Sequence, residues 1–212
     1  MELQAAFDHL LSTETPLDGL DALVWHSLAA GATVGKHPWA TGCLTTIAKN
    51  VDEQSCPSSR TVVLRRCDVE AHSIDFHTDV RSSKVQELEC GQAAVCWLFY
   101  HPSTKIQLRL QGTACVLNDR QADAAWETVS LLSRSAYLSF EPPSKAVAGS
   151  QPPSTTERFV ELAESERGRE NFRLVRTQVE LVDLLYLRQG GHVRASIAYG
   201  EKSSVELSWL VP

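Results

Sequence analysis

The chain has 212 residues and a formal net charge of −6; 43% of its residues are hydrophobic and 22% are charged. This composition is typical of a globular protein, and one domain is the simplest expectation for the length. The acidic balance argues against a nucleic-acid partner, because binding to phosphate backbones needs a basic field. No run of about 18 apolar residues is present, and the N-terminus shows no signal-peptide pattern. We therefore expect a cytoplasmic protein without membrane contact.

The first half of the chain predicts one helix followed by strands. Residues 17–30 place leucine and valine at helical spacing. Residues 39–50 are typical of a strand, and the polar residues 52–59 are typical of a turn. Two further strands are expected at 60–68 and 73–78, where β-branched and aromatic residues gather.

The middle of the chain alternates helices and strands. A short helix is expected to start near Lys84 and to stop at Gly91. Residues 93–100 are apolar throughout and predict a strand buried on both faces. Residues 106–117 alternate apolar and polar side chains, which predicts a strand with one buried face. A further helix is expected over 119–133.

The last third predicts a long loop, a helix and a closing set of strands. Residues 141–156 hold four prolines and many small polar residues, so a loop is expected there. A surface helix is expected at 157–170, and strands at 174–188, 192–199 and 205–212. The order of elements favours an α+β fold, mainly antiparallel β, with peripheral helices.

The six cysteines form no C-x-x-C pair, and no histidine cluster accompanies them. We therefore expect thiols rather than disulfides and no metal site.

The most informative stretch lies between residues 60 and 109. The sequence RTVVLRR, residues 60–66, puts three arginines on a strand of an acidic protein. Arg81, two serines and Lys84 then open a short helix, which adds free N–H groups and partial positive charge. Two interpretations follow: an anion site near Arg60 and Lys84, or a solvent-facing basic surface of little energetic value. Arg66 fits the second interpretation better.

Three ordered segments, RTVVLRR, FHTDVRSSK and IQLRLQG, resemble the pyridoxamine 5′-phosphate oxidase family of FMN-binding split barrels. A Gln-Gly-Gly turn, an arginine, a late tryptophan and the final Leu-Val-Pro extend the resemblance over most of residues 20–212. It points to the broader branch of related flavoproteins rather than to the vitamin enzyme itself. It implies a single FMN-binding domain over residues 1–212, built as a split, Greek-key β-barrel. It also implies FMN as cofactor and a homodimer with FMN at the subunit interface.

The resemblance implies roles for individual residues. Arg60 and Lys84 would hold the FMN phosphate, with the serines beside Lys84. The backbone after Arg60 would run along the isoalloxazine ring, and Arg65 would lie near its polar edge. The expected FMN-binding residues are Arg60, Thr61, Val62, Val63, Leu64, Arg65, His77, Thr78, Ser82, Ser83, Lys84 and Gln107.

The C-terminal hairpin departs from the family pattern. Arg188 stands at a tryptophan position, Ser196 at a histidine position and Ala198 at an arginine position, while Arg194 is retained. Arg194 and Ser196 are therefore the expected substrate contacts. We expect fewer contacts with a pyridoxamine phosphate substrate than in the family pattern.

The leading hypothesis is an FMN-dependent oxidoreductase in which the flavin takes a hydride from a small substrate. No acid or base is identified. The alternatives are a dimer that binds FMN or another phosphorylated ligand without turnover, and a haem-binding split-barrel relative. Ser133 and Ser135 lack His–Asp partners at a recognisable spacing. Trp25, Trp97 and Trp126 are expected in the core or at a dimer interface.

Overall fold

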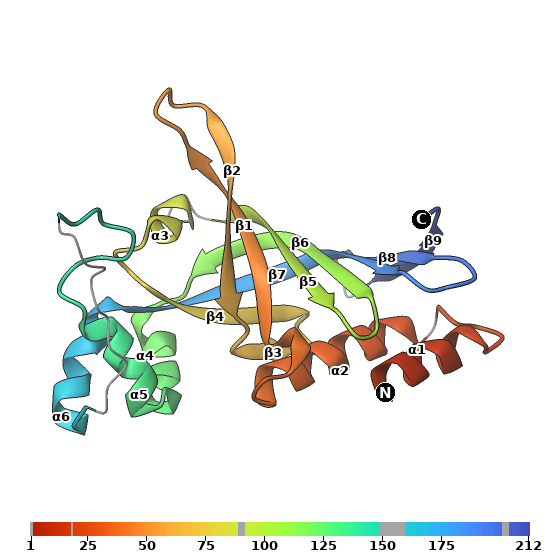
Figure 1. Cartoon of the computed structure of the whole chain (residues 1–212), viewed down its shortest axis with the longest axis horizontal. Helices are drawn as coiled ribbons and strands as arrows, with labels where there is room; N and C mark the ends of the chain where they lie inside the picture. Colours follow the sequence, from red (N-terminus) through yellow and green to blue (C-terminus); the bar gives the residue numbers. More distant parts are fainter. Residues whose placement is uncertain (1, 18, 89–91, 149–159, 201–203) are drawn as a thin grey trace.

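The computed structural model in Figure 1 shows a long, twisted antiparallel sheet flanked by helices. It describes residues 2–17, 19–88, 92–148, 160–200 and 204–212. The strands are β1 (Thr41–Lys49), β2 (Ser55–Val63), β3 (Arg66–Asp68), β4 (Ser73–Asp79), β5 (Ala93–His101), β6 (Ile106–Val116), β7 (Phe172–Tyr186), β8 (Val193–Tyr199) and β9 (Val205–Leu210). The α-helices are α1 (Glu2–Leu11), α2 (Leu20–Thr33), α3 (Ser83–Leu88), α4 (Asp119–Thr128), α5 (Leu131–Arg134) and α6 (Leu162–Ser165).

Every strand pair in the sheet is antiparallel. The strands follow the order β2-β1-β5-β6-β7-β4-β3, and β8 and β9 extend the sheet from β7. The prediction of an α+β fold dominated by antiparallel strands is therefore confirmed. Among the residues described, no helix is both long and apolar enough to cross a membrane.

The core lies between one face of the sheet and the two N-terminal helices. Trp25 of α2 and Trp97 of β5 are fully buried there, and Trp126 of α4 is buried in a second, smaller cluster. Each large apolar side chain stabilises the fold by about 1.5–3 kcal/mol when it is buried. The expectation that these tryptophans pack internally is confirmed.

The opposite face of the sheet is exposed. β5 alternates buried and open positions, and Leu98 and Tyr100 keep 39% and 46% of their surface exposed. Within a single chain, the prediction that residues 93–100 are buried on both faces is therefore wrong. The apolar run is continuous, but only its inward side chains meet the core. Val63 of β2 and Ile47 of β1 are exposed as well.

Two boundaries differ from the sequence-based expectation. Residues 55–59, expected in a turn, pair with β1 and belong to β2, so β1 and β2 form a long arm that rises from the sheet (Figure 1). The strand expected at 60–68 is interrupted between Val63 and Arg66, where Leu64 donates its N–H to Ala40 O. This break separates Arg60 on β2 from Arg66 on β3.

Most helices lie near the predicted positions, but their lengths differ from the predicted lengths. α2 and α3 lie where they were expected, whereas α1 was not predicted. The expected helix at 119–133 is divided into α4 and α5, and α6 is a single short turn followed by a 3₁₀ segment. Residues 141–148 form no helix or strand, as expected for the proline-rich loop; the remainder of that loop lies outside the described residues.

Candidate functional site

The first group of expected site residues gathers where the end of β4 meets α3 and β2. We call Arg60, Thr78, Ser82 and Lys84 the cationic cradle. Lys84 Nζ donates to Ser82 Oγ at 2.7 Å and to Thr78 Oγ1 at 3.2 Å. Burial lowers the pKa of Lys84, and the positive charge of Arg60 lowers it further. The two cations therefore act on one another across the cradle, as the anion-site interpretation requires.

Arg60 is held more firmly than Lys84. Its Nη2 donates to Glu87 Oε2 at 2.7 Å and to Ser58 Oγ at 2.9 Å. Its Nη1 donates to Ser58 O at 2.9 Å and to Thr46 Oγ1. Lys84, in contrast, has only neutral hydroxyl partners, and no carboxylate among the described residues lies within ion-pair distance of it. A partly buried ammonium without an anionic partner indicates a place for an external anion.

Ser83 and residues 61–64 make none of the hydrogen bonds of the cradle. Ser83 is exposed at the start of α3 and makes none of the contacts above. Val62 and Leu64 point into the core, while Thr61 and Val63 are exposed. β2 ends the order of paired strands, so its backbone outside the β1 ladder is available to a ligand.

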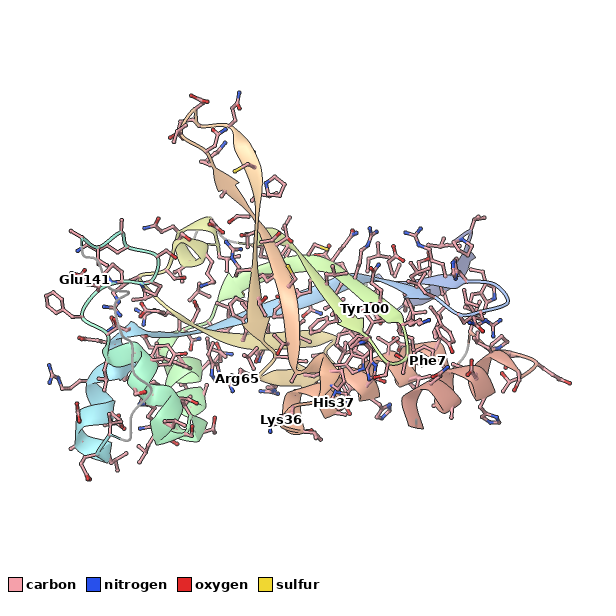
Figure 2. The ribbon with its side chains drawn as sticks, viewed as in Figure 1. Phe7, Lys36, His37, Arg65, Tyr100 and Glu141 are labelled. Atoms are coloured by element: carbon pink, nitrogen blue, oxygen red, sulfur yellow. The ribbon has the colours of Figure 1, made fainter. Side chains whose placement is uncertain are left out.

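A second group lines a cavity of about 640 Å³ between β4, β7, α4 and the N-terminus of α5. We call it the basic pocket; Arg65, Arg66 and Arg176 supply its positive charge. Arg65 lies at the lower end of β2, between α2 and the α4–α5 helices (Figure 2). The full lining is Ala32, Arg65, Arg66, Asp75, His77, Gln121, Ala124, Ala125, Thr128, Val129, Ser130, Ser133, Leu174 and Arg176.

Charge in the basic pocket is only partly neutralised. Arg176 donates through Nε and Nη2 to the buried carboxylate of Asp75, both at 2.8 Å. Arg66 pairs with Asp68 near the surface. Burial lowers the pKa of His77 to about 4, with a smaller contribution from Arg65. His77 is therefore uncharged at neutral pH and can accept or donate one hydrogen bond there.

A third group lies on the exposed sheet face, where neighbouring strands align Gln107, Arg194 and Ser196. Arg194 donates to Asp183 through Nε at 3.0 Å and Nη2 at 2.7 Å, and Arg109 Nη2 donates to the same carboxylate at 2.8 Å. These hydrogen bonds, led by Arg194, lower the pKa of Asp183. We call Arg109, Asp183 and Arg194 the sheet-face cluster.

The structure thus sorts the expected site residues into three places. Thr78 belongs to the cradle and the adjacent His77 to the basic pocket, because successive side chains of β4 point to opposite sides. Within the described residues of one chain, no hydrogen bond or ion pair joins the sheet-face group to the cradle or to the basic pocket.

Sequence reasoning missed the acidic partners. Glu87 follows Lys84 by three residues on α3, and this helical spacing could have marked it as a neighbour of the cradle. Asp75 and Asp183 meet their arginines across strand pairs that are distant in sequence, so no local signal identifies them.

Comparison with known families agrees with this geometry. The family model described as "Pyridoxamine 5'-phosphate oxidase, FMN-binding domain" matches residues 24–118, which include the cradle and Gln107. A little under half of the chain is therefore similar to the FMN-binding domain of that family, in agreement with the resemblance seen in the sequence. Arg194 and Ser196 lie outside the matched region, so the match supports no role for them.

Curated relatives match a similar share of this chain. A pyridoxine/pyridoxamine 5′-phosphate oxidase 2 of Arabidopsis thaliana is 35% identical over 91 residues, covering 39% of this chain and 45% of the relative. A pyridoxine/pyridoxamine 5′-phosphate oxidase of Allorhizobium ampelinum is 36% identical over 85 residues, covering 40% and 39%. The chain therefore spans less than half the length of these relatives.

Solved structures show the same fold over a longer range. A pyridoxamine 5′-phosphate oxidase-related, FMN-binding protein of Nostoc punctiforme aligns with a TM-score of 0.66 at 20% identity, over 90% of this chain and 96% of that one. PhzG of Burkholderia lata, in complex with tetrahydrophenazine-1-carboxylic acid, aligns with a TM-score of 0.64 at 19% identity, over 89% of each chain. The predicted split-barrel fold is therefore confirmed.

Proposed function

We propose that this chain binds FMN, with the phosphate in the cationic cradle, and acts as an oxidoreductase. The observation that carries the proposal is Lys84, a partly buried cation that has hydroxyl partners and Arg60 nearby but no carboxylate of its own. The donors around it fit a phosphate: an ammonium, two hydroxyls and a guanidinium.

The proposed contacts with the isoalloxazine ring come from the end of β2 and the residues that follow it. Val62 and Val63 run away from the cradle along the edge strand β2, whose side away from β1 can approach the isoalloxazine ring. The N–H of Leu64 already donates to Ala40 O. Arg65 continues this line toward the basic pocket. When bound, FMN supplies hydride transfer between a substrate and an acceptor such as oxygen. The protein's part is to hold the phosphate, orient the ring and exclude water.

A homodimer is part of the proposal. In one chain, Gln107 and Arg194 lie on the exposed sheet face, apart from the cradle. The same face exposes Val63, Leu98 and Tyr100, an apolar surface that a second copy would bury. Two copies packed through this face can complete one FMN site with residues of both.

The proposed substrate is a small anion held in the basic pocket. Arg66 and Arg176 line that pocket, and Asp75 fixes the guanidinium of Arg176 by two hydrogen bonds. Similar proteins are named for anionic molecules: a phosphate in the pyridoxine/pyridoxamine 5′-phosphate oxidases and a carboxylic acid in the PhzG complex. His77, uncharged beside Arg65, can hydrogen-bond the reacting part of such a molecule.

Titration of the purified protein with FMN tests the proposal. We expect quenching of flavin fluorescence, a flavin absorbance spectrum that remains after desalting, and a particle of twice the chain mass. Absence of flavin binding at micromolar FMN would contradict it. Anaerobic bleaching of bound flavin by pyridoxamine 5′-phosphate, tested beside other small anions, would then identify a substrate.

One observation favours a binding protein without turnover. Ser196 and Ala198 replace a histidine and an arginine of the family pattern, and Asp183 already binds Arg194. A bound flavin that no tested anion bleaches would favour this second function.

A further inference from the structure

Glu87 places a carboxylate inside the cationic cradle. Its side chain is only 10% exposed, and its Oε2 accepts hydrogen bonds from Arg60 Nη2 at 2.7 Å and from Thr46 Oγ1. The position on α3 is one helical turn beyond Lys84, so one short helix supplies both a cation and an anion to the same place.

The hydrogen bonds of Arg60 show what the carboxylate does there. Nη1 donates to Ser58 O and Thr46 Oγ1, and Nη2 donates to Ser58 Oγ and Glu87 Oε2. Both terminal nitrogens therefore already make the two hydrogen bonds that each can donate. A phosphate that engages the guanidinium fork must displace one of these acceptors, and only Glu87 carries a charge.

The charges lead to the same conclusion. Arg60, Lys84 and Glu87 together leave the cradle with a net charge of +1, whereas a phosphomonoester brings about −1.5 to −2 at neutral pH. Glu87 therefore repels the ligand that Lys84 and Arg60 attract. In a partly buried site this repulsion is screened less than it is in bulk water.

We propose that Glu87 is an internal competitor for the ligand phosphate: it holds Arg60 in the empty protein and weakens phosphate binding. The inference rests on the proposed function for the identity of the flavin. A purely orienting role, in which Glu87 aims Arg60 at the phosphate, predicts the opposite effect on affinity.

The test compares wild type with Glu87→Gln, which keeps the size of the side chain and one acceptor oxygen but removes its charge. Glu70→Gln, an exposed position in the turn at the other end of β4, removes the same charge away from the cradle and serves as the matched control. Dissociation constants are measured for FMN and for riboflavin, which lacks the phosphate.

We expect Glu87→Gln to bind FMN about five- to tenfold more tightly, as loss of one nearby charge repulsion predicts, with riboflavin unchanged. Without ligand, the same variant should melt about 2–4 °C lower, because the contact with Arg60 is weakened. Glu70→Gln should alter neither. Opposite signs in affinity and in stability without ligand distinguish competition from orientation.

Unchanged or weaker FMN binding by Glu87→Gln would overturn the inference. If no variant binds FMN, the proposed function fails, and inorganic phosphate then decides the role of Glu87. In that arm, phosphate should raise the melting temperature of Glu87→Gln more than that of wild type, and equal shifts would overturn the inference.

Discussion

The cationic cradle and the sheet-face cluster contain the same charges: two cations and one carboxylate. In the sheet-face cluster, Asp183 accepts from both Arg109 and Arg194, so each arginine has an ionic partner. In the cradle, Glu87 forms an ion pair with Arg60 but not with Lys84, whose partners are hydroxyls. The difference teaches that the pairing of charges, rather than their number, separates a structural cluster from a candidate anion site.

The largest expected effect is on stability, at the sheet-face cluster. Asp183→Ala leaves Arg109 and Arg194 without the carboxylate that they share. Asp183 is buried, with 5% of its surface exposed. We expect the free energy of unfolding to fall by about 2–3 kcal/mol, which is less than the roughly 3–5 kcal/mol for a fully buried pair because both arginines reach solvent. Urea denaturation measures it, and Asp52→Ala, at the exposed tip of the β1–β2 arm, is the control. If the free energy of unfolding fell by less than about 0.5 kcal/mol, as for a surface pair, the sheet-face cluster would not differ from the cradle as a structural cluster.

The opposite behaviour is expected at the cradle. Lys84→Ala removes a desolvated cation that forms no ion pair among the described residues, so the free energy of unfolding should stay within about 0.5 kcal/mol of wild type. FMN should bind at least about tenfold more weakly, since a charge-assisted contact contributes about 1.5–3 kcal/mol. Fluorescence titration measures the affinity, and riboflavin, without a phosphate, should bind equally to both proteins. A variant that loses stability but keeps its FMN affinity would place the phosphate elsewhere.

The contrast also explains how much of the site could be predicted from sequence. Arg60, Ser82 and Lys84 fall within ordered segments of the sequence, and local signals place Arg60 on a strand and Lys84 on a helix, with Ser82 just before it. The grouping of Arg66 with Arg176 could not be predicted, because it depends on the register by which β4 pairs both β3 and β7.

The fold shows the same division between local and long-range information. Alternation on β6 and the turn residues between strands were sufficient for the antiparallel sheet. The β1–β2 arm was shortened in the prediction because Pro57 and the serines around it suggest a turn. In the structure these residues pair with β1 at the edge of the sheet, where a proline N–H is not needed.

His77 extends the comparison to a second desolvated group. Its pKa is about 4 in the folded protein against 6.5 when exposed, so the unfolded chain binds more protons between these values. The free energy of unfolding should therefore fall as pH drops from 6.5 to 4, by about 1–2 kcal/mol after allowance for partial solvent exposure. His77→Phe, which can pack on Phe172, should flatten this slope, whereas the exposed control His192→Gln should not. An unchanged slope in His77→Phe would mean that His77 is not the group responsible.

The smallest effect is expected at Arg66, whose side chain is 60% exposed and pairs with Asp68 near the surface. Arg66→Ala should change the free energy of unfolding by less than about 0.5 kcal/mol, because exposed pairs contribute little. The matched variant Arg176→Ala leaves the buried Asp75 carboxylate unpaired and should cost several times more in the same urea titration. If Arg66 nevertheless serves an anion in the basic pocket, Arg66→Ala should weaken binding of that anion while stability stays constant. Equal losses of stability in the two variants would show that pairing with a buried acid does not distinguish these arginines.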